Sequence, residues 1–148
     1  MEGQTLDTVD SEKDLGIMIS SDLKSSNQCI QACRKASKML GMIKRTISYK
    51  NPEIMVRLYK TLVRPHLEYC VSAWSPHYIK DKELLERIQQ RFTRMIKEVP
   101  GKDYLDRLKE LNLWTLEERR NRADLVVLFK MYKGFTAIHL SLYYGRPM

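Results

Sequence analysis

Apolar side chains recur with helical spacing in residues 80–99, and this pattern restricts the possible folds more than any other feature of the sequence. At 3.6 residues per turn they fall within about a third of the helix circumference; they are Leu84, Leu85, Ile88, Phe92, Met95 and Ile96. A helix with one such stripe buries it against another element of a packed domain. The pattern therefore predicts an amphipathic helix that ends at Pro100 and Gly101.

Two further helices are predicted before this one. Cap oxygens at Ser25–Asn27 favour the start of a helix that runs to Ile47 and carries its own apolar stripe. Asn51 followed by Pro52 provides a cap and a first-turn proline, which predicts the start of a second amphipathic helix. Several cations of the first helix fall on the face opposite its stripe; they are Arg34, Lys38 and Arg45.

The sequence LVRPHLEYCVSAWSP contains two prolines that predict a bend between helices. Arg64 precedes Pro65, and a residue before proline is disfavoured in the α conformation, so the second helix should stop there. Pro65 can open a short third helix that Pro76 closes. Tyr69 and Trp74 supply large apolar faces, and their polar tips can satisfy backbone groups at the bend.

Two more helices are predicted near the C-terminus. A short one covers Tyr104–Leu111, and the last begins at Thr115, where Glu118 follows at the spacing of a reciprocal capping pair. The second half of the last helix contains LVVLF, which is apolar on nearly all sides. This composition indicates a central helix or, alternatively, a buried strand. Gly134 is a plausible C-terminal stop.

Only LGIMIS, from Leu15 to Ser20, has the pattern of a strand. Together the segments predict a mostly α fold, a helical bundle of about five to six helices with one short N-terminal strand. A chain of 148 residues is long enough for one domain. No apolar run approaches the roughly 20 residues that a membrane-spanning helix needs, so we expect no membrane association.

The N-terminus and the cysteines bear on the cellular compartment. MEGQTLDTVDSEKD is acidic and polar, which is not the composition of a signal or transit peptide. The three cysteines are an odd number and argue against a disulfide framework. These features predict an intracellular protein, nuclear or cytoplasmic, that is not secreted.

Charge is distributed unevenly along the chain. Residues 1–23 carry six acids and one lysine, a net charge of −5, which leaves +13 for the rest of a chain whose net charge is +8. A domain this basic indicates a polyanionic partner.

Three patterns that suggest catalysis or metal binding lack the residues that would complete them. His66 and Glu68 form the H-x-E of zinc deaminases, but the P-C-x-x-C that completes that site does not follow. Cys29 and Cys33 could pair with His66 and Cys70 around a metal, yet the first two fall in an apolar stripe. A Cys70–His66 nucleophile pair has no oxyanion site nearby. We expect no catalytic residue, no metal site and no cofactor.

Two helices carry basic stripes that would suit phosphate contacts. Arg87, Arg91 and Arg94 lie within about 60° of one another on the long helix, and the last helix adds a second line of cations. The alternative is a pair of solvated faces with i, i+4 ion pairs such as Glu83–Arg87. The expected nucleic-acid-binding residues are Arg87, Arg91, Arg94, Lys97, Arg119, Arg122, Lys130 and Lys133.

Five blocks, in this order and spacing, match a known pattern: DLGIMISSDL, KASKMLGMIKR, LYKTLVRPHLEYCVSAWSP, ELLERIQQRFTRMI and LWTLEERRNRADLVVLFKMYKG. From about Ser11 to Gly134 the chain resembles the region after the polymerase palm in reverse transcriptases of LINE-type, non-LTR retrotransposons, of the jockey-like and chicken-repeat groups. No single block would be specific, but the five together are.

The resemblance implies a division of the chain and a function. Residues 1–23 would be an acidic segment with the short strand at the end of the palm region. Residues 24–134 would be a thumb- or connection-like domain that grips the template–primer duplex, and residues 135–148 a divergent tail that is a candidate for disorder. The implied partners are an RNA–DNA hybrid or an RNA or DNA backbone, and the upstream palm.

The metal-binding aspartate pair of the family palm and its endonuclease are not among these residues. We therefore expect this fragment of an RNA-directed DNA polymerase to be inactive alone. A surface that would face the palm, around Ile17, Ile19, Tyr69 and Trp74, could cause self-association. The rival hypothesis is a degenerate or co-opted helical module that binds protein and has no nucleic-acid function.

Overall fold

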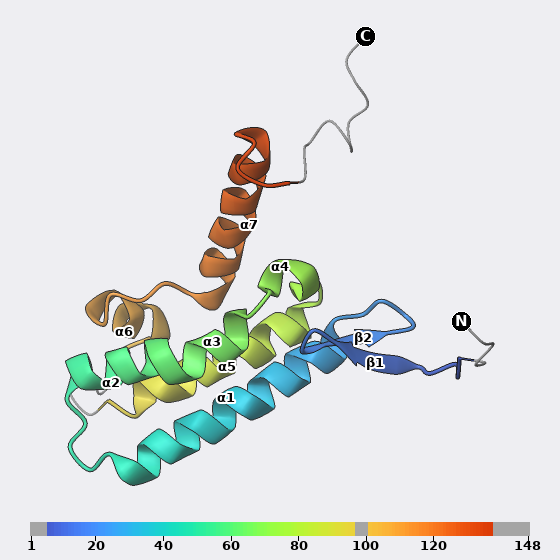
Figure 1. Cartoon of the computed structure of the whole chain (residues 1–148). Coiled ribbons are helices and arrows are strands. Elements are labelled where there is room, and N and C mark those ends of the chain that lie inside the picture. Colours follow the sequence, from blue (N-terminus) through green and yellow to red (C-terminus); the bar gives the residue numbers. More distant parts are fainter. Residues whose placement is uncertain (1–5, 97–100, 138–148) are drawn as a thin grey trace.

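The structure, a computed structural model, describes residues 6–96 and 101–137 and confirms the mostly α class (Figure 1). A two-stranded sheet precedes the helices. In chain order the elements are β1 (Ser11–Asp14), β2 (Ile17–Ser20), α1 (Ser26–Thr46), α2 (Pro52–Leu58), the π-helical turn η1 (Tyr59–Val63), α3 (Arg64–Glu68), α4 (Val71–Trp74), α5 (Ile79–Arg94), α6 (Tyr104–Glu110) and α7 (Leu116–Tyr132).

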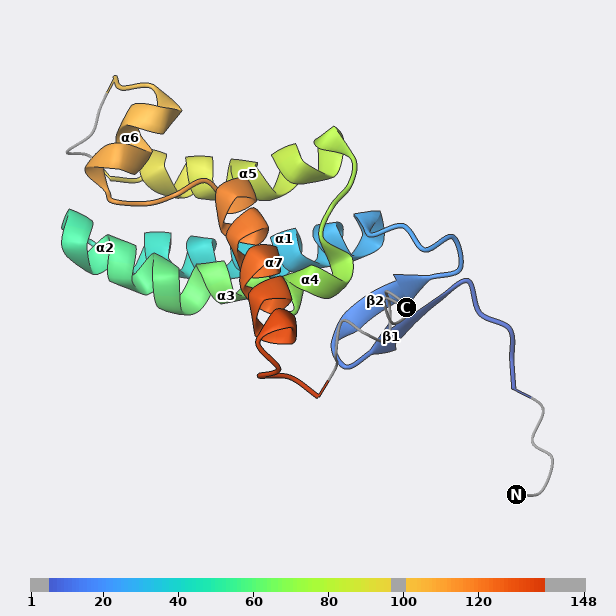
Figure 2. The same ribbon diagram turned by 90° about the horizontal axis from the view of Figure 1, so that it is seen from above.

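Helices α1 and α5 pack along each other, and the continuous segment α2–η1–α3 lies against them (Figures 1 and 2). The predicted stripe of α5 is confirmed as a core face, because Leu85, Ile88 and Phe92 are buried. The rings of Tyr59 and Phe92 stack with 4.3 Å between centroids at the centre of the body. Helix α6 packs on α5, while α7 leaves the body at a steep angle (Figure 1).

The predicted strand is confirmed as β2, and it pairs with a strand that the sequence did not indicate. β1 is antiparallel to β2, with Ser11 opposite Ser20 and Asp14 opposite Ile17. Leu15 and Gly16 form the turn with φ of 46° and 87°, the positive values that a tight hairpin requires. β1 is wholly exposed and polar, so it lacks the apolar alternation by which a strand is recognised.

The prediction that the second helix stops at Arg64 is wrong. Arg64 has α-helical dihedrals, and its N–H donates to the carbonyl of Tyr59 five residues earlier. This wide π turn places Pro65 in the first turn of α3, where the N–H that proline lacks is not needed. The backbone conflict that normally ends a helix before proline is thereby avoided.

The bend lies instead at Tyr69 and Cys70, where Cys70 adopts a left-handed conformation with φ of 49°. The Nε1–H of Trp74 donates to the carbonyl of Tyr69 at 2.7 Å, as expected for a tryptophan tip at a bend. Trp74 itself is buried, so it does not belong to the exposed apolar patch predicted from the sequence. Ile19 and Tyr69 are exposed.

The predicted start of α7 is confirmed, and the predicted burial of its second half is wrong. Thr115 and Glu118 form the reciprocal capping box, and Gly134 follows the helix with φ of 71°. LVVLF is helical, but Leu125 is 66% and Phe129 55% exposed. The core of the body is closed by the other helices, and the buried residues of α7 are confined to its first turns. Helix α5 ends at Arg94, before Pro100, which lies outside the described residues.

In residues 6–96 and 101–137, no helix combines the length and the apolar character needed to cross a membrane.

We expect a thiol reagent to label only one of the three cysteines rapidly in the native protein. Cys29 and Cys33 are buried in α1, and burial raises the pKa of Cys29 to about 11 and that of Cys33 to about 12, whereas only a thiolate reacts. Cys70 is exposed. The number of labelled cysteines is read from the intact mass after brief treatment with N-ethylmaleimide at neutral pH. The denatured chain should take up three labels. Rapid labelling of all three in the native protein would contradict the packing of α1.

Candidate nucleic-acid interface

Two neighbouring hollows along α1 and α5 are lined by basic side chains. One, of about 370 Å³, contains Lys44, Lys50, Arg91 and Arg94. The other, of about 730 Å³, extends toward the N-terminal half of α1, and Arg91 lines both. We call the combined surface the α1–α5 groove. Its cations are Arg34, Lys35, Lys38, Lys44, Lys50, Arg87, Arg91 and Arg94.

The groove follows from how the two helices bury their apolar stripes. Cations that flank the stripe of α1 and cations that flank the stripe of α5 meet at the seam once the stripes pack together. Gly41 lines the seam. A Cβ added there would meet no atom within 4 Å, so the groove is not filled by side chains at this position. The helix pairing therefore places three arginines of α5 beside four cations of α1, and Lys50 joins them from the segment between α1 and α2.

The cations of the groove have almost no acidic partner among the described residues. Among the described residues that line either hollow there is no aspartate or glutamate. Arg87 lies 3.9 Å from Glu83, and both side chains are mostly exposed, which makes this a weak pair. Within the described part of the chain, no ion pair involves any of the other seven. Such a concentration of unpaired positive charge favours an anionic ligand.

The eight residues predicted from the sequence do not form one surface. Arg87, Arg91 and Arg94 lie in the α1–α5 groove, and Lys97 lies outside the described residues. The remaining four line no part of the groove: Arg119, Arg122 and Lys130 are on α7, and Lys133 is its C-cap residue. The α1 side of the groove was not predicted, because the spacing of Arg34 and Lys38 had indicated the helix face opposite the apolar stripe.

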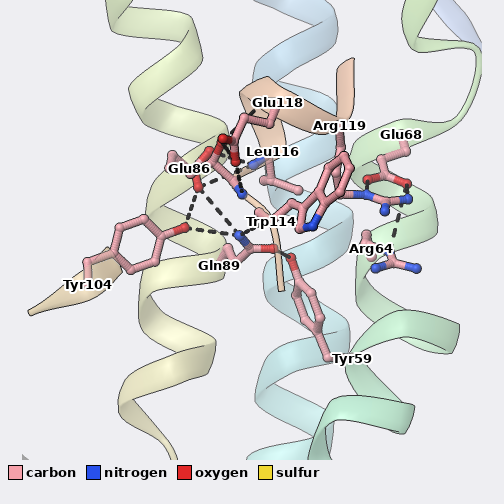
Figure 3. A network of polar contacts seen from close by, with 11 residues as sticks. Tyr59, Arg64, Glu68, Glu86, Gln89, Tyr104, Trp114, Leu116, Glu118 and Arg119 are labelled. Atoms are coloured by element: carbon pink, nitrogen blue, oxygen red, sulfur yellow. Dashed lines mark hydrogen bonds and ion pairs between the residues drawn. The ribbon is translucent and has the colours of Figure 1, made fainter. Parts of the chain in front are cut away.

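Arg119 is held by an ion pair between distant parts of the chain (Figure 3). Its Nη2 donates to Oε2 of Glu68 at 3.0 Å, and its Nε donates to the other carboxylate oxygen. This bond raises the pKa of Arg119, and Arg64 adds a second cation 3.8 Å from the same carboxylate. Glu68, which the H-x-E pattern had made a candidate for acid–base chemistry, thus ties α3 to α7.

A third hollow, of about 640 Å³, lies where α7 meets η1 and α3. We call it the Trp114 pocket. Four cations line it, and the guanidinium of Arg122 lies over the indole ring of Trp114 at 4.9 Å from its centroid. None of the described residues lines both this pocket and the α1–α5 groove. The cations are Lys60, Arg64, Arg119 and Arg122.

A buried polar network fixes the start of α7 against α5 (Figure 3). Gln89 is fully buried; its Oε1 accepts from the hydroxyl of Tyr59 at 2.7 Å, and its Nε2 donates to the carbonyl of Trp114 at 2.9 Å. Glu86 accepts from the N–H of Leu116 at 3.1 Å and from the hydroxyl of Tyr104. Burial raises the pKa of Glu86, whereas these two hydrogen bonds lower it. Each of these groups has a structural partner, so the network positions α7.

The residues of the other chemical alternatives are dispersed. Cys29 and Cys33 face the core, and the thiol of Cys33 donates to the carbonyl of Leu84 at 3.5 Å. Cys70 is exposed at the bend. In the described ranges, no group of three or more His, Cys, Asp or Glu side chains could hold a metal ion.

Comparison of this chain with protein-family models, with curated proteins and with solved structures finds no match.

Proposed function

We propose that this chain binds the backbone of a nucleic acid through the α1–α5 groove. The observation that carries the proposal is eight cations in two adjoining hollows without an acid among the described lining residues. Phosphate contacts by Lys and Arg supply most of the affinity of proteins for nucleic acids. In its specific form, the chain is a fragment of a LINE-type RNA-directed DNA polymerase that grips an RNA–DNA template–primer.

The dimensions of the groove suit several consecutive phosphates. Arg34 and Lys44 are ten residues apart on α1, which at 1.5 Å per residue places them about 15 Å apart along the helix. One strand of a duplex presents a phosphate roughly every 3.4 Å of axis, so about four phosphates fit this length. Cations of α5 face the same seam, and they can contact a backbone that follows it.

The side chains of the groove favour recognition without sequence preference. Lysine and arginine contacts to phosphate fix register and carry no base information. A hybrid of A-like geometry is recognised by its shape and its phosphates, because its deep, narrow major groove does not admit side chains. We therefore expect similar affinity for hybrids of different sequence.

A protein-interaction module remains the second candidate function, and the exposed face of α7 favours it. Leu125, Leu128 and Phe129 are each at least half exposed, an unusual arrangement for apolar residues of one helix. A partner protein could cover them. This candidate requires no phosphate contacts, so the two functions differ in the salt dependence of binding.

The test of the proposal is a salt titration of RNA–DNA hybrid binding. About four phosphate contacts should reduce affinity by roughly 10²-fold between about 50 mM and 200 mM salt. Replacing Arg91 with Ala should weaken binding equally for all sequences and lower the slope of log affinity against log salt by about one contact. Fluorescence anisotropy with labelled hybrids measures both quantities.

The matched control is Arg57→Ala, because Arg57 is an exposed arginine on α2, is paired with Glu53 and lies outside the groove. It should leave affinity and slope unchanged. Weak binding by the wild type, or an unchanged slope for Arg91→Ala, would sink the proposal and favour the protein-interaction module.

A further inference from the structure

We infer that the Trp114 pocket holds an unpaired nucleotide of a nucleic-acid strand, with its base stacked at Trp114 and its phosphate on the surrounding cations. This inference rests on the proposed nucleic-acid function and adds a second contact of a different kind. A cavity of about 640 Å³ is within the range of small-ligand sites and is large enough for one nucleotide.

The exposure of Trp114 is the first observation behind the inference. Its neighbours Leu113 and Leu116 are buried, whereas Trp114 is 46% exposed and lines a concave surface. The backbone of Trp114 is anchored, because its carbonyl accepts a hydrogen bond from Nε2 of buried Gln89 at 2.9 Å (Figure 3). The indole is therefore presented from a fixed position, which is how aromatic platforms for bases are built.

Charge is the second observation, and it indicates a ligand that carries phosphate. Glu68 pairs with Arg119 and lies near Arg64, so it compensates part of the positive charge. Within the described residues, neither Lys60 nor Arg122 forms an ion pair. Arg122 also covers the indole, and a guanidinium plane stacks on bases as an aromatic ring does. The pocket thus combines a stacking surface with an excess of cations.

A base must be unpaired to use this pocket. In a duplex the faces of the bases are covered by their neighbours in the stack, and a protein can reach them only after they are unstacked. Among the described residues that line the α1–α5 groove there is no tryptophan, tyrosine or phenylalanine, so they offer phosphate contacts but no ring on which a base could stack. The groove therefore binds the duplex, and the Trp114 pocket binds a nucleotide of a single strand.

The test measures binding of a short oligothymidine and of a blunt RNA–DNA hybrid to the same set of variants. Trp114→Ala should weaken oligothymidine binding by about tenfold or more, because a base stacked on an aromatic side chain is typically worth that much, and should leave hybrid affinity unchanged. Arg91→Ala should weaken binding of the hybrid and leave the affinity for oligothymidine unchanged. Tyr78→Ala is the matched control, since Tyr78 is also 46% exposed and has Lys80 over its ring, but lies outside the pocket.

Tryptophan fluorescence emission provides a second measurement, which uses the wild type and the conservative variant Trp114→Phe. Oligothymidine should quench the emission of exposed Trp114 and leave that of buried Trp74, so Trp114→Phe should abolish the quenching while retaining most of the affinity. Thermal melts of each variant verify folding. The inference is overturned if wild type shows no quenching, if Trp114→Ala weakens both ligands equally, or if free adenosine monophosphate binds as tightly as the strand. If only the proposal for the groove is wrong, Arg91→Ala will leave hybrid binding unchanged while Trp114→Ala still weakens oligothymidine binding.

Discussion

Replacing Lys38, Arg91 and Arg94 together with Glu is expected to reduce affinity for an RNA–DNA hybrid by roughly 10³-fold or more. The three side chains lie on both walls of the α1–α5 groove. Each hydrogen bond to a charged group is worth about 1.5–3 kcal/mol, and three lost bonds at the lower end already account for about three orders of magnitude. Repulsion between the new carboxylates and phosphate adds to this loss.

The control changes the same number of charges on exposed cations outside the groove. Arg57, Lys80 and Lys109, each replaced with Glu, also lower the net charge from +8 to +2, so both variants are equal in long-range attraction. This control should bind the hybrid within about tenfold of the wild type. Binding is measured by anisotropy and folding by thermal melts. Equal losses in the two variants would show that binding follows net charge and that the groove has no special part in it.

Replacing Phe92 with Ala is expected to lower the free energy of unfolding by about 3–5 kcal/mol, which is the usual cost of deleting a buried phenylalanine ring. Phe92 is fully buried and stacks on Tyr59, which has no exposed surface either. The surrounding helices can close such a cavity only in part. A loss of this size is a large fraction of the stability of a domain of this length.

Urea unfolding followed by circular dichroism measures this change. Phe135→Ala is the matched control, because it removes the same ring from a side chain that is 74% exposed, and it should change the free energy by less than about 0.5 kcal/mol. A loss below about 1 kcal/mol for Phe92→Ala would mean that the stacked pair is not at the centre of the core.

Local signals in the sequence identified the helix starts that the structure confirms. Asn51 caps α2 through hydrogen bonds from the N–H groups of Glu53 and Ile54, and Thr115 caps α7 with Glu118. These signals act within one turn and need no knowledge of the rest of the fold. The stop predicted before Pro65 relied on a local rule too, but the π turn at η1 changes the hydrogen-bond register on which that rule depends.

The candidate site was only partly predictable because it depends on which helices become neighbours. The spacing of Arg87, Arg91 and Arg94 reveals a basic line on α5, but it does not identify α1 as the opposite wall. Arg119 had no acid at helical spacing, and its partner Glu68 is 51 residues away. Likewise, LVVLF has the composition of a central helix, and only the arrangement of the other helices leaves it outside the core.

The scarcity of acids among the described residues of the α1–α5 groove also has a thermodynamic consequence for the protein without a ligand. Eight like charges along one seam repel one another, and folding brings them closer than they are in the unfolded chain. That repulsion opposes the hydrophobic contact between α1 and α5. Anything that neutralises the charges in the folded state, whether salt or a bound polyanion, shifts the equilibrium toward the folded chain. A polyanion bound in this groove would therefore stabilise the folded helix pair.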